Sequence, residues 1–130
     1  MPRKESLYPN DWLRIAEKDF ARVERLLLGH DAEAAGFFLQ QAVEKFLKAY
    51  LLSKGWQLQR IHDLEPLLNE ALKFETSFEL YRFILQKITG FYFVERYPFV
   101  LDAGLTENEI QEAFTQIKGL VDTIRSQLKN

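Results

Sequence analysis

The chain of 130 residues contains no cysteine and only two histidines, His30 and His62. Without cysteine there is no disulfide framework, no thiolate nucleophile and no cysteine-based metal site, and nothing requires an oxidising compartment. Two histidines do not provide a metal-ligand spacing such as H-E-x-x-H, and the carboxylates follow the pattern of solvated helix faces. The sequence therefore predicts no metal, no cofactor and a cytoplasmic location.

Secretory, membrane and nucleotide-loop signals are also missing. The opening residues MPRKESLYPND are basic but lack the apolar core of a secretory signal. Charges interrupt the most apolar stretch, residues 31–55, too often for a membrane span of about 20 apolar residues. There is no strand-period run, G-x-S-x-G elbow or glycine-rich phosphate loop. The formal net charge of -2 gives no general attraction to nucleic acid or lipid.

What the sequence does contain is helical periodicity. Apolar residues recur at helical spacing in five segments, about 11–28, 31–54, 63–73, 77–95 and 106–128. The expected capping residues are Asn10 or Asp11, Asp31, Asp63, Thr76 and Thr106, the last two with a glutamate three residues later. We therefore predict one all-α domain over residues 1–130, an up-and-down bundle of four to five helices, with residues 1–10 as a solvated lead-in.

Residues 31–55 form the expected central helix. Their apolar side chains cover most of the helix circumference, which is typical of a buried helix. The remaining polar stripe consists of Gln40, Glu44 and Lys48, with Gln41 and Lys45 beside it. We expect this stripe to face solvent or a second copy of the chain, with Glu44 and Lys48 as an ordinary i, i+4 pair.

Two charged positions interrupt apolar helix faces. Asp19 lies on the inward face of the first helix, where an unpaired carboxylate is costly, so a partner is expected. Arg96 continues the inward direction of the fourth helix. An Asp19–Arg96 ion pair would fix the packing of these helices. Alternatively, Asp19, Arg96 and the adjacent Tyr97 would bind a phosphate, which suits the planar fork of an arginine.

Aromatic residues gather around the end of the fourth helix. Phe93 points outward on a helical wheel, and Tyr97, Pro98 and Phe99 belong to a predicted loop. Exposed aromatic residues beside an arginine are typical of an interface centre and of a base-stacking surface. We favour the interface, and these four residues are the candidates for contact with a second copy.

Four sequence motifs occur in a fixed order along the chain. They are A-x-x-D-F around Asp19, FFLQQAVEKFLKAYL in the second helix, H-D-L from His62, and Y-x-x-x-R-Y-P from Tyr92 to Pro98. Together they closely resemble the HEPN domain, the "higher eukaryotes and prokaryotes nucleotide-binding" family. The resemblance implies a helical bundle, usually a homodimer, that binds nucleotides. It also implies a separately encoded minimal nucleotidyltransferase as partner, in a toxin–antitoxin or related two-component system.

The resemblance also bears on catalysis. Many HEPN members are metal-independent ribonucleases with an arginine followed, a few residues later, by a histidine. The corresponding arginine is Arg96, but residues 97–102 contain no histidine. We therefore favour a non-catalytic module that binds nucleotide or phosphate, a nucleotidyltransferase, or both. The alternative is a metal-independent ribonuclease toxin in which folding brings His62 to Arg96.

Overall fold

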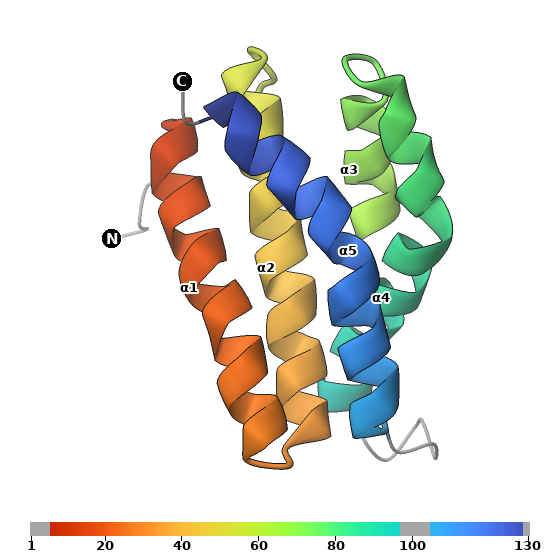
Figure 1. The fold of residues 1–130 in the computed structure, drawn as a ribbon. Helices are drawn as coiled ribbons and strands as arrows, with labels where there is room; N and C mark the ends of the chain where they lie inside the picture. Colours follow the sequence, from red (N-terminus) through yellow and green to blue (C-terminus); the bar gives the residue numbers. More distant parts are fainter. Residues whose placement is uncertain (1–5, 97–104, 129–130) are drawn as a thin grey trace.

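The computed structural model describes residues 6–96 and 105–128, with backbone alone for residues 93–96. In these parts the elements are α1 (Pro9–Leu28), α2 (Ala32–Ser53), α3 (Leu64–Ala71), the 3₁₀ helix η1 (Thr76–Tyr81), α4 (Arg82–Arg96) and α5 (Glu107–Leu128) (Figure 1). The described ranges contain no β-strand. The predicted all-α bundle is confirmed. Within the same ranges, no helix combines the length and apolarity needed to cross a membrane.

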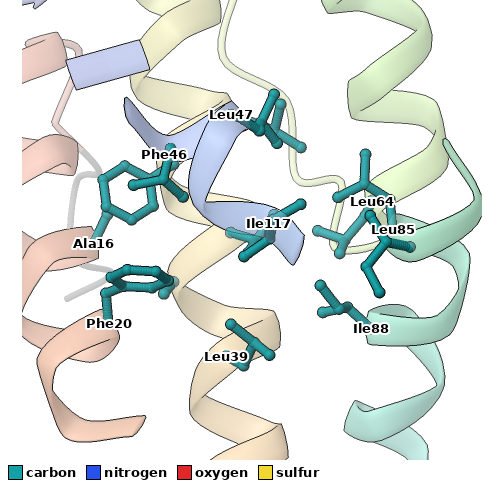
Figure 2. Close-up of a cluster of buried hydrophobic side chains, with 14 of the residues drawn as sticks. Ala16, Phe20, Leu39, Phe46, Leu47, Leu64, Leu85, Ile88 and Ile117 are labelled. Atoms are coloured by element: carbon teal, nitrogen blue, oxygen red, sulfur yellow. The ribbon is translucent and has the colours of Figure 1, made fainter. Parts of the chain in front are cut away.

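Helix α2 is the centre of the bundle, as its apolar circumference predicted. It contacts α1, α3, α4 and α5, and in Figure 1 α5 crosses in front of it with α1 on one side and α3 and α4 on the other. The core fills the space around it. Figure 2 shows this core between the five α-helices, with the labelled side chains of Ala16, Phe20, Leu39, Phe46, Leu47, Leu64, Leu85, Ile88 and Ile117.

The start of α1 corrects the predicted cap. The helix begins at Pro9 with Tyr8 as the N-cap residue, so the expected cap at Asn10 or Asp11 is wrong. Proline suits the first helical position because its fixed φ matches the helix and its missing N–H would have no helical partner there. The Asp11 carboxylate instead accepts a hydrogen bond from Ser6 Oγ at 2.7 Å.

The predicted capping box at Thr76 is also wrong. Residues Thr76–Tyr81 form a 3₁₀ helix, and α4 begins only at Arg82. The Glu79 carboxylate accepts hydrogen bonds from Arg82 at 2.6 and 3.0 Å, and Arg82 also donates to Glu65 of α3 at 2.8 Å. These hydrogen bonds hold the pKa of both glutamates below the usual range. Pairing of Glu79 with Arg82, which also binds Glu65 of α3, thus replaces the predicted cap.

Asp31 and Thr106 cap their helices as predicted, whereas Asp63 precedes α3 without a side-chain capping hydrogen bond. Asp31 accepts a hydrogen bond from the Ala34 amide at 3.2 Å, and Thr106 Oγ1 accepts one from the Glu109 amide at 3.1 Å. Helix α3 starts after Asp63, as predicted, but ends at Ala71 rather than at residue 73. The loop predicted from Tyr97 through Pro98 and Phe99 lies outside the described residues.

Candidate functional site

The polar stripe of α2 is buried, which corrects the expectation that it faces solvent or a second copy. Gln40, Glu44 and Lys48 are only 1%, 4% and 2% exposed. Helix α1 covers the stripe on one side, where the Lys48 ammonium lies 5.3 Å from the ring centroid of Trp12. The connection before α3 covers the other side through His62. The stripe is therefore an internal polar network, and such networks are costly unless their groups are paired.

A polar cluster beside the stripe surrounds Asp19. Its buried carboxylate accepts hydrogen bonds from Lys45 Nζ at 2.5 Å and from Arg22 Nη1 at 2.7 Å. The Lys45 side chain is 22% exposed and that of Arg22 is 45% exposed. Asp19 therefore has the partners that its position demanded, Arg22 on α1 and Lys45 on α2. Two cations around one carboxylate leave a net positive charge at the surface.

The buried stripe itself is centred on Glu44. Its Oε2 accepts a hydrogen bond from Lys48 Nζ at 2.9 Å, and its Oε1 accepts one from Gln40 Nε2 at 3.2 Å. The Nδ1 atom of His62 lies 3.3 Å from the same Oε2, while the backbone oxygen of His62 accepts from Gln40 Nε2 at 2.9 Å. The His62 side chain is 71% exposed. The buried carboxylate thus holds one edge of an imidazole whose other edge is open to solvent.

A series of aromatic rings leads to the Asp19 cluster. Tyr92 of α4 stacks on Phe37 at 5.6 Å between centroids, and Phe37 meets Phe38 edge-to-face at 5.4 Å. The Arg22 guanidinium lies 5.3 Å from the Phe38 centroid. Phe37, Phe38 and Tyr92 are all half-buried. Cations and aromatic rings therefore form one continuous series from α4 across α2 to α1.

The half-buried residues of α2 share one side of the helix. Phe37, Phe38, Gln41 and Lys45 fall within a sector of about 100° when 100° is allotted to each residue. Arg22 of α1 borders this sector through its contacts with Asp19 and Phe38. We call these five residues the open edge of α2. Its donors and π-surfaces are suited to a ligand that combines negative charge with aromatic rings.

Two cavities lined by described residues have a different chemistry. One, of about 480 Å³ between α3 and α4, is lined by Asp63, Glu65, Pro66, Asn69, Gln86 and Thr89. The other, of about 340 Å³ between α1 and α5, contains one cation, Lys118, which lies over the buried ring of Phe114. Neither lining combines several cations with half-exposed rings, as the open edge does.

Comparison with known proteins places the bundle in a family. A family model of the HEPN domain matches residues 9–127. The chain belongs to the HEPN family. The crystal structure of TT1696 from Thermus thermophilus is similar to this HEPN domain with a TM-score of 0.77 and 25% sequence identity, over 92% of this chain and 98% of TT1696. No curated protein gave a significant match.

The HEPN domain brings only some of the predicted site residues together. Asp19 binds Arg22 and Lys45, and His62 contacts Glu44 in a separate group. Arg96 is the last residue of α4, and its side chain, like that of Phe93, is outside what the structure describes, as are Tyr97, Pro98 and Phe99.

The residues that sequence reasoning missed are Arg22 and Lys45. A signal for both was present, because a carboxylate on the inward face of α1 needs a cation within one turn or on the neighbouring antiparallel helix. Arg22 is three residues after Asp19, and Lys45 borders the only polar stripe of α2. The rings of Phe37 and Phe38 carried no such signal, because core aromatic residues look the same in sequence.

Proposed function

We propose that this HEPN domain is a non-catalytic helical module that binds a nucleotide or another phosphate-bearing ligand at the open edge of α2. The observation that supports this proposal is the Asp19 cluster, in which one buried carboxylate binds two partly exposed cations, Arg22 and Lys45. Arg22 has five N–H donors and uses Nη1 for Asp19, and the Lys45 ammonium has three. The remaining donors can bind phosphate oxygens while Asp19 keeps both cations in place.

Nucleotide binding is tested by thermal unfolding with millimolar AMP or ATP. A ligand at about 100 times its dissociation constant stabilises the native state by roughly 2.7 kcal/mol. We expect stabilisation of the unaltered chain and a much smaller effect for Arg22→Gln. Arg14→Gln is the matched control, because Arg14 is exposed on the same helix and pairs with Asp11 instead. Equal stabilisation of Arg22→Gln and the unaltered chain would place the ligand elsewhere.

We further propose that the module is a homodimer that works with a separately encoded minimal nucleotidyltransferase in a toxin–antitoxin-like system. Membership of the HEPN family supports this proposal. The candidates for contact between copies remain Phe93, Tyr97, Pro98 and Phe99. Light scattering at micromolar concentration tests the dimer, and a monomer mass would contradict it. Co-purification with a nucleotidyltransferase encoded beside this chain tests the partner.

A second function, a metal-independent ribonuclease, is favoured by one observation. The buried Glu44 carboxylate lies 3.3 Å from Nδ1 of the exposed His62 ring. A carboxylate at Nδ1 orients an imidazole and leaves Nε2 for proton transfer. In this alternative His62 moves the proton and Arg96 stabilises charge on the phosphate. We rank it second because no histidine follows Arg96 at the ribonuclease spacing.

RNA incubated with purified protein and EDTA distinguishes the two functions. The binding module leaves the RNA intact. The ribonuclease cuts it, and both His62→Asn and Arg96→Ala abolish the cutting. Cleavage that depends on both side chains would overturn the non-catalytic proposal.

A further inference from the structure

We infer that the groove between α1 and α5 binds a small zwitterion, an α-amino acid with an apolar side chain, through Glu24 on one wall and Lys118 on the other. The groove consists of two cavities of about 340 and 300 Å³, whose linings share Glu24, Phe114 and Lys118. None of the five residues of the open edge lines either cavity. The inferred site is therefore separate from the proposed phosphate site.

Ion pairs bridge the two walls at both ends of the groove. Helices α1 and α5 run in opposite directions (Figure 1). Towards the end of α5, Arg125 donates hydrogen bonds to the Glu17 carboxylate of α1 at 2.6 and 2.7 Å. At the start of α5, Oε1 of Glu107 lies 2.9 Å from Nδ1 of His30, which follows α1. These contacts fix the walls and limit the length of the groove.

Between these ion pairs, one anion and one cation face each other without pairing. Glu24 follows Glu17 by seven residues, and Lys118 precedes Arg125 by seven. Seven residues are about two turns and 10 Å of helix, so both side chains lie at the same level. Glu24 has no ion pair or hydrogen bond among the described residues, and the Lys118 ammonium lies 4.8 Å from the ring centroid of Phe114. The middle of the groove thus holds two opposite charges that lack ionic partners.

This pair of charges selects a ligand that carries both signs. The other charged side chains in the lining already form ion pairs. An ammonium at Glu24 and a carboxylate at Lys118 would satisfy both groups, whereas a ligand with one charge leaves the other group unpaired. A phosphate ligand is disfavoured, because carboxylates outnumber the two cations of the lining. These carboxylates are Glu17, Glu24, Glu107 and Asp122.

The apolar part of the lining suits the body of such a ligand. Leu28 is 82% exposed, and the ring of Phe114 is covered by the Lys118 side chain. When Lys118 turns towards a ligand carboxylate, a face of that ring becomes available for an apolar side chain. The two volumes lie near the lower limit of small-molecule sites, about 300 Å³. A partner helix of about 10–12 Å diameter is too wide for this space.

A ¹⁵N–¹H NMR titration with L-phenylalanine tests the inference. We expect the largest shift changes at the amides of Ala21, Glu24, Phe114 and Lys118. Phenethylamine lacks the carboxylate and phenylpropanoate lacks the ammonium, so each should bind at least about fivefold more weakly, as expected for one lost charged contact. Glycine keeps both charges but lacks the apolar side chain, and it should also bind more weakly than phenylalanine.

Two variants test the role of each charge. Glu24→Gln should remove the preference for phenylalanine over phenylpropanoate, and Lys118→Gln should remove the preference for phenylalanine over phenethylamine. A general fold defect would not change the two preferences in this separate way. Glu112→Gln and Lys18→Gln are the matched controls, because both residues are exposed and lie outside the two cavities. Both should bind phenylalanine within about twofold of the unaltered chain.

Three outcomes would overturn the inference. The first is an absence of shift changes with millimolar phenylalanine. The second is equal binding of phenylalanine, phenethylamine and phenylpropanoate, which would show that the two charges play no part. The third is unchanged binding of phenylalanine by both Glu24→Gln and Lys118→Gln. None of these results bears on nucleotide binding at the open edge, which is tested with Arg22→Gln.

Discussion

Exchanging a carboxylate for an amide is expected to cost far more stability at Glu44 than at Asp19. The ion-pair partner of Glu44 is Lys48, whose ammonium is buried 2.9 Å away. Glu44→Gln leaves that charge inside the bundle, which costs about 3–5 kcal/mol. The partners of Asp19 are the partly exposed Arg22 and Lys45, which can turn towards water. Asp19→Asn should therefore cost about 1–2 kcal/mol.

Urea unfolding followed by far-ultraviolet circular dichroism measures this difference. Both variants should lower the midpoint without changing the slope, because the native and unfolded states bury and expose the same surface. For a domain of this size, the loss at Glu44 also corresponds to a fall in Tm of roughly 10–20 °C. Native domains are stable by only about 5–15 kcal/mol, so the effect at Glu44 is a large fraction of the total.

A second substitution separates an orphaned charge from general damage. Lys48→Met in the Glu44→Gln background removes the unpaired ammonium, and the double variant should recover most of the lost stability. Equal losses for Glu44→Gln and Asp19→Asn would refute the assignment of Lys48 as the costly buried charge. So would a double variant that is no more stable than Glu44→Gln.

Two further pairs of variants test the caps and the glycine contacts by chemical denaturation. Thr106→Ala should lose about 1 kcal/mol because its hydroxyl caps α5, whereas Thr76→Ala should change stability by less than about 0.5 kcal/mol because η1 begins without a side-chain cap. Gly119→Ala places a Cβ in steric conflict with the hydroxyl of Tyr81 and should cost about 1–2 kcal/mol. Gly90→Ala meets nothing within 4 Å and should stabilise α4 by about 0.5–1 kcal/mol. Equal losses within either pair would contradict these contacts.

The helices could be predicted because their signals are local. Apolar spacing, the Asp31 cap and the Thr106 cap depend only on neighbouring residues, and the structure confirms all three. The prediction at Thr76 was wrong because Glu79 pairs with Arg82, which is also bound to Glu65 of α3, instead of capping a helix. The predicted start of α1 was wrong because the N-cap preference of Asn10 and Asp11 was given more weight than the preference of proline for the first helical position, which Pro9 occupies.

The site could be predicted only in part, because its geometry depends on which helix covers which. A helical wheel places Glu44 and Lys48 on the polar side of α2 but does not show that Trp12 and His62 close over that side. The need of Asp19 for a partner was evident from sequence. The choice of Lys45 as one partner depends on the register of α1 against α2, which the sequence does not specify.

The most direct test of the central proposal, that the open edge of α2 holds the ligand, is a ¹⁵N–¹H NMR titration with AMP. We expect the largest shift changes at the amides of Phe37, Phe38, Gln41 and Lys45 and at the Nε–H of Arg22. Changes centred on another face of the bundle, or no changes at millimolar AMP, would contradict it.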